Sequence, residues 1–78
     1  MPYIPKERRG KEPEKAGELS YEFAVAIVKY IRKKGKSYQA LNDIIGALEA
    51  CRFEMVRRLV NPYEDEKRSK NGDVLEDV

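Results

Sequence analysis

The stretch SYQALNDIIGALEACRFEMVRRLV, residues 37–60, decides the fold because it is the longest continuous amphipathic segment. Ser37 is suited to cap a first helical turn, and no proline interrupts the run until Pro62. A strand is excluded because the apolar residues do not alternate and the run is too long. At helical spacing one broad face collects Leu41, Ile44, Ile45, Leu48, Cys51, Met55, Val56 and Leu59. The stretch is therefore predicted to form one long helix.

Arg52 is the polar exception on this apolar face, where it projects between Leu48 and Met55. A long arginine side chain usually extends from such a position to reach water. The alternative is an arginine inside an oligomer interface, paired with Glu49 or with a carboxylate of another chain. The sequence leaves both interpretations open.

An earlier helix is predicted over residues 19–34, because Phe23, Ile27 and Ile31 share a face and Gly35 is a natural stop. Since only a short turn separates it from residues 38–60, the two helices are predicted to form an antiparallel hairpin. Residues 1–16 hold three of the four prolines and many charges. They are interpreted as a flexible N-terminal arm preceding a single helical domain, residues 17–78.

A short third helix is predicted over residues 62–70. Asn61 is expected to act as the N-cap with Pro62 in the first helical position, and Asn71-Gly72 supplies the stop. In this interpretation Pro62 turns the chain, so that the third helix folds back on the hairpin. The predicted fold class is thus all-α.

The composition limits both size and chemistry. With 78 residues, 38% of them charged, and a mean hydropathy of -0.74, the chain has little apolar material for a core of its own. Assembly as a homodimer, in a four-helix bundle, is the expected remedy. The chain has no histidine and one cysteine, which excludes zinc-finger, Cys–His and Ser–His–Asp arrangements within one chain. No catalytic residue, metal ligand or cofactor is predicted, and no membrane span or signal peptide is visible; a cytoplasmic location is expected.

Charge is distributed unevenly along the chain. Residues 1–36 carry ten basic and five acidic side chains, whereas residues 37–78 carry six basic and nine acidic ones. The basic excess includes a cluster without an intervening acid: Lys29, Arg32, Lys33, Lys34 and Lys36. This cluster is interpreted either as a phosphate- or nucleic-acid-binding patch or as a solvated helix end that complements the helix dipole.

A second candidate site is polar and is predicted where residues 38–60 meet the segment 61–73. Two arginines there could hold a phosphate or carboxylate in a fork, with carboxylates orienting them. The predicted ligand-binding residues are Asp43, Glu54, Arg57, Arg58, Tyr63 and Asp65. The alternative is an ion-pair network without a ligand, since Glu54 and Arg58 are also at ordinary surface spacing on a helix.

Several segments resemble a family of short uncharacterised proteins from prokaryotes, their phages and mobile elements, classed as a domain of unknown function. The segments are GELSY at 17–21, LNDIIGALE at 41–49 and PYEDEKRSKNGDV at 62–74, which are similar to GELNY-, LNDVIGVLE- and PYEDEKxxxNGDV-like segments of that family. The chain is shorter than such relatives between Arg9 and Gly17. The resemblance implies no established activity, although many of the shared positions are polar.

The function predicted from these patterns is non-enzymatic: a small interaction or ligand-binding module, associated with phages or mobile elements. Its expected partner is a second copy, with a protein or a small anionic ligand as further partners. One alternative is a nucleic-acid or nucleotide binder that uses the basic cluster. The other is a magnesium-dependent nucleotide hydrolase like the all-α pyrophosphatases, although the sequence lacks their paired ExxE- and ExxD-type clusters.

Overall fold

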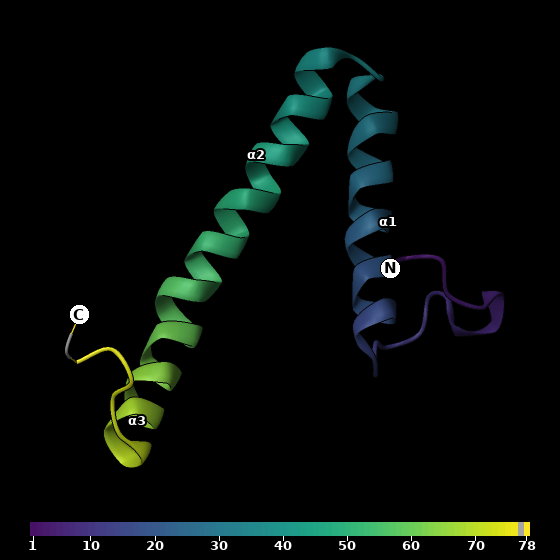
Figure 1. Cartoon of the computed structure of the whole chain (residues 1–78). Coiled ribbons are helices and arrows are strands. Elements are labelled where there is room, and N and C mark those ends of the chain that lie inside the picture. The colour runs from purple at the N-terminus through teal and green to yellow at the C-terminus, as the bar shows by residue number, and fades with distance from the viewer. Residues whose placement is uncertain (77) are drawn as a thin grey trace. The chain divides into compact units, whose positions relative to one another are not determined.

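The computed structural model describes residues 1–76 and 78, and within them it is helical without a strand. A short 3-10 helix, η1 (Lys6–Arg8), precedes the α-helices α1 (Ala16–Lys34), α2 (Tyr38–Met55) and α3 (Asn61–Asn71), as Figure 1 shows. A π-helical turn, η2 (Val56–Val60), lies between α2 and α3. The prediction of an all-α class is confirmed. Across this described part of the chain, every helix is too short or too polar to cross a membrane.

The turn between α1 and α2 forms as the local sequence predicts. Gly35 ends α1 with φ 86° and ψ 152°, a conformation that L side chains rarely adopt, and its N–H donates to the Ile31 carbonyl at 2.7 Å. Ser37 then caps α2, since its Oγ accepts a hydrogen bond of 3.1 Å from the Ala40 N–H. These two residues fix where α1 stops and where α2 starts.

The chain divides into two compact units, Met1–Ile44 and Ile45–Val78, and buried side chains occur in the first. Ala40 and Ile44 are 4% and 9% exposed and lie one helical turn apart near the start of α2. The Tyr30 hydroxyl donates to Asp43 Oδ2 at 3.4 Å, which links α1 to this same part of α2. Of the apolar face predicted for residues 37–60, Ile44 is buried and Val56 is half-buried, whereas the other members are exposed.

The prediction of a turn at Pro62 is wrong, because helical residues continue without a break from Tyr38 to Asn71. Asn61 has helical dihedrals, φ -61° and ψ -48°, and no side-chain cap hydrogen bond forms at the start of α3. Its N–H donates instead to the Val56 carbonyl, five residues back. Proline inside an α-helix clashes with the carbonyl four residues earlier. The wider π turn relieves that clash, so the helix passes Pro62 and ends at Gly72.

Candidate functional site

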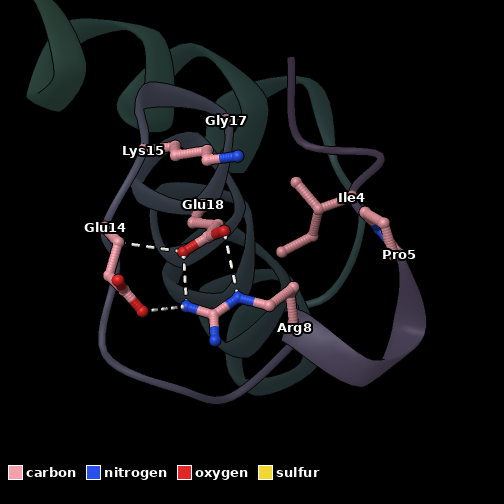
Figure 2. A pocket seen from close by; sticks show the side chains of 7 residues that line it. All are labelled: Ile4, Pro5, Arg8, Glu14, Lys15, Gly17 and Glu18. Carbon is pink, nitrogen blue, oxygen red and sulfur yellow. Dashed lines mark hydrogen bonds and ion pairs between the residues drawn. The ribbon is translucent and has the colours of Figure 1, made fainter.

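The most highly bonded polar cluster in the described residues is an ion-pair clamp formed by Arg8, Glu14 and Glu18 (Figure 2). Arg8 binds Glu18 in a fork: its Nε donates to Oε2 at 3.1 Å and its Nη2 donates to Oε1 at 2.8 Å. The same Nη2 lies 2.9 Å from Glu14 Oε2. Bidentate arginine–carboxylate pairs of this kind are stronger and more directional than a lysine pair. The clamp therefore fixes η1 against the start of α1.

The clamp also completes the N-terminus of α1. Glu18 is the third residue of the helix, and its Oε1 accepts a hydrogen bond of 2.9 Å from the Glu14 N–H. A carboxylate at this position satisfies a free amide and complements the positive end of the helix dipole. Glu18 is 8% exposed, the one buried charged residue of the described chain, and each of its oxygens has a partner. The role of this carboxylate is therefore structural: it joins the N-terminal segment to the start of α1.

Two further contacts tie the N-terminal segment to α1. The Arg9 guanidinium lies 5.5 Å from the centre of the Tyr21 ring, within cation–π range, and its Nε donates to the Ile4 carbonyl at 3.1 Å. Gly17 lies so close to the segment that an added Cβ would be 3.2 Å from the Met1 carbonyl oxygen. Residues 1–16 were interpreted from the sequence as a flexible arm, whereas these contacts place the N-terminal segment against the first turns of α1.

The electrostatics of the clamp are those of a structural ion pair. Hydrogen bonds from Arg8 and from the Glu14 backbone N–H lower the pKa of Glu18 to about 2, and the same Glu18 contact raises the pKa of Arg8. An open hollow of about 460 Å³ lies beside the clamp, lined also by Ile4, Pro5, Lys15 and Gly17. A carboxylate with such a low pKa stays ionised near neutral pH and is a poor proton donor there.

Acidification should weaken this clamp in a defined window. Since folding lowers the pKa of Glu18 from 4.5 to about 2, its stabilisation is complete above pH 4.5 and declines as the pH falls toward 2. Glu18→Gln should therefore lower the melting temperature clearly at pH 7 and much less at pH 2.5. Thermal unfolding followed by circular dichroism at both pH values measures the difference, with the exposed Glu22→Gln as the matched control. An equal deficit at both values would refute the assignment.

The predicted ligand-site residues are exposed, and five of the six contact residues three or four positions away along the chain. Glu54 pairs with Arg57, and Asp65 lies 3.7 Å from Arg68. The Lys67 ammonium lies 5.5 Å from the Tyr63 ring centre. Arg57 and Arg58 both fall within η2. Because the helix continues through Pro62, the predicted turn that would carry Tyr63 and Asp65 back toward these arginines does not form. The ligand site itself stays a prediction.

Asp43, the remaining member of that predicted set, belongs to the first unit. Its Oδ1 accepts a hydrogen bond of 2.7 Å from Gln39 Nε2, and its Oδ2 accepts the bond from Tyr30. A shallow hollow beside it is lined by Tyr30, Lys34, Ser37, Gln39 and Ala40. The contacts observed for Asp43 are therefore those of a residue that joins α1 to α2.

The basic cluster lies at the end of α1 and in the turn that follows. All five side chains, Lys29, Arg32, Lys33, Lys34 and Lys36, are exposed. None of the ion pairs found among residues 1–76 and 78 involves them. Residues 1–76 and 78 contain no group of three or more Asp, Glu or Cys side chains placed to hold a metal ion.

Comparison with known proteins gives one family. The family model described as Domain of unknown function (DUF6899) matches residues 1–74. No curated protein and no solved structure matches the chain. The family match includes the N-terminal segment and the clamp residues as well as the helices. The chain therefore belongs to the family described as Domain of unknown function (DUF6899).

Proposed function

We propose that the protein is a small, non-enzymatic interaction module, and that its binding surface is an apolar row on the second unit. The row consists of Ile45, Leu48, Met55 and Leu59, which are 65%, 40%, 50% and 67% exposed. Together with Arg52, which lies between Leu48 and Met55, these residues recur every three or four positions, so they follow one side of the helix. Contiguous exposed apolar surface on a soluble chain typically marks an interaction site. This exposed row is the observation that supports the proposal.

The proposed partner is a second copy of the chain. The second unit has no buried side chain among its described residues, 45–76 and 78, so this unit by itself gives its apolar side chains little cover. Chains of this size commonly gain a sufficient core by oligomerisation. Pairing of two copies along the row would produce a dimeric helical bundle.

A charge placed in the row should abolish dimer formation. Ile45→Glu would bring an uncompensated carboxylate into the apolar contact, so its dimer dissociation constant should rise by about 100-fold or more. Ala50→Glu, on the opposite side of the same helix, is the matched control and should leave the dimer intact. Sedimentation equilibrium of the wild type and both variants gives the masses. A wild-type monomer at high micromolar concentration would refute the proposed self-association.

A nucleic-acid-binding module is the second candidate, favoured by the exposed and unpaired state of the basic cluster in the described residues. Tyr38, which is 84% exposed, adds an aromatic surface next to it on which a base could stack. Titration with a single-stranded oligonucleotide at several salt concentrations tests this candidate. Affinity that falls steeply with salt, and that is lost on changing Lys33 and Lys34 to Glu, would support it.

The polar ligand site and the magnesium-dependent hydrolase remain proposals from the sequence. The first rests on Arg57 and Arg58, which lie in a π turn, a feature often found at functional sites. A thermal-shift screen with nucleotides, small anions and divalent cations tests both. Stabilisation by an anion that disappears in Arg58→Lys would support a forked arginine site.

A further inference from the structure

We propose that the apolar rows of two copies pair as an antiparallel seam in which Arg52 of each helix packs between Leu48 and Glu49 of the other. This inference rests on the proposed self-association and adds the direction and register of the pairing. Three properties of the described residues lead to it: the spacing of the row, the position of one cation within it, and the position of the nearest carboxylate.

The spacing is that of a coiled-coil seam. Ile45, Leu48, Arg52 and Met55 are separated by three, four and three residues, all within the regular α-helix that ends at Met55. In heptad notation Ile45 and Arg52 occupy a positions, while Leu48 and Met55 occupy d positions. All four side chains are available, since the apolar ones are at least 40% exposed and the Arg52 side chain is 61% exposed. Both a and d positions are therefore free to accept a partner helix.

The cation selects the direction of pairing. In a parallel pair each a position faces the same a position of the partner, so the two Arg52 guanidinium groups would meet inside the seam. In an antiparallel pair, a positions face d positions, so each Arg52 meets an apolar side chain instead. Bringing two like charges together away from water is costly, which disfavours the parallel arrangement.

The carboxylate selects the register. With Arg52 opposite Leu48, Ile45 falls opposite Met55, and the next residue along the partner is Glu49. Glu49 already binds Arg52 of its own chain, with Arg52 Nε donating to Oε1 at 3.0 Å, and this contact lowers the pKa of Glu49. Two arginines and two glutamates then meet at the centre of the seam without net charge. A shift of one heptad places Arg52 opposite Met55, which is followed by Val56. The carboxylate before Met55, Glu54, lies at an outer c position and is paired with Arg57.

Cysteine cross-linking tests the direction and register together. Cys51 is exposed, so Cys51→Ser removes it first, and Ile45→Cys and Met55→Cys are then introduced separately into that background. The proposed seam places residue 45 of one copy opposite residue 55 of the other. A short bis-maleimide should therefore cross-link an equimolar mixture of the two variants, at least tenfold more than either variant alone. Ala50→Cys, mixed with the Ile45→Cys variant, is the matched control and should not react across the dimer.

The outcomes separate this inference from the proposed function. Cross-linking of each variant with itself would show parallel helices, and a dimer without cross-links would show another interface; either overturns the seam but leaves self-association standing. A monomer in sedimentation overturns both. As an independent measurement, Glu49→Arg should weaken the dimer about tenfold or more. The double variant Glu49→Arg/Arg52→Glu, which restores opposite charges, should recover dimerisation, and failure of that recovery would contradict the register.

Discussion

Replacing Pro62 with alanine should raise the free energy of unfolding by up to about 3 kcal/mol, the usual cost of a proline inside a helix relative to alanine. The reason is that Pro62 lies within helical residues that continue from Tyr38 to Asn71, not at the start of a separate helix. Alanine restores a backbone N–H and removes the ring that the π turn accommodates. Chemical denaturation of both proteins at one fixed concentration measures the gain.

Pro13→Ala is the matched control, because Pro13 lies outside the helices in the segment before α1. Loss of a compatible proline there should lower stability by less than about 1 kcal/mol. The result for Pro62→Ala also decides between two descriptions of this region. A proline in the first position of an independent helix is favourable, so a neutral or destabilising effect would contradict a continuous helix.

Ile44→Ala should have the largest destabilising effect of any apolar truncation in the chain, about 2–5 kcal/mol. Ile44 is 9% exposed and, with Ala40, forms the buried apolar part of the first unit. Small domains have marginal total stability, so a loss of this size should leave the variant largely unfolded at 37 °C. Equilibrium unfolding in urea, followed by circular dichroism, measures the difference.

Phe53→Ala controls for size alone. Phenylalanine is the larger side chain, but Phe53 is 63% exposed, so its removal should change stability by about 0.5 kcal/mol or less. Ile44→Val, which removes one methylene, should fall between them at about 0.5–1.5 kcal/mol. Equal effects of Ile44→Ala and Phe53→Ala would contradict the assignment of Ile44 to the core.

The parts of the fold that could be predicted depend on neighbouring residues. Gly35 and Ser37 indicate the turn. Gly35 tolerates a positive φ, and Ser37 caps the next helix through a residue three positions later. Gly72 likewise ends the last helix, with φ 96°. Such signals involve no distant partner, so sequence alone suffices to read them.

Pro62 shows why a local rule can fail. Proline is favourable at the first position of a helix and unfavourable inside one, so Asn61-Pro62 suggested a helix start. In the structure the turn before Pro62 is instead a wider π turn. The composition of residues 56–60 does not indicate this change of the backbone. The segment after Pro62 was therefore correctly predicted as helix, while its separation from residues 38–60 was not.

The clamp could not be predicted for a different reason. Glu18 at the third position of a helix is a recognisable local signal, but its main partner, Arg8, is ten residues away across an irregular segment. Several other basic residues in residues 1–15 were equally eligible in the sequence. The candidate site residues of α2 and α3 were placed on helices correctly, yet their mutual arrangement depended on the turn at Pro62 that does not form.

The π turn at Val56–Val60 has a consequence for how chain length can vary among relatives. A π turn holds one residue more than the α turn it replaces, so deleting one residue there yields a regular helix whose flanking faces stay nearly in place. The same deletion inside α2 would rotate all later side chains by about 100°. A regular turn, however, restores the clash with the proline ring. Natural relatives that lack one residue in this turn should therefore also lack a proline at the position of Pro62.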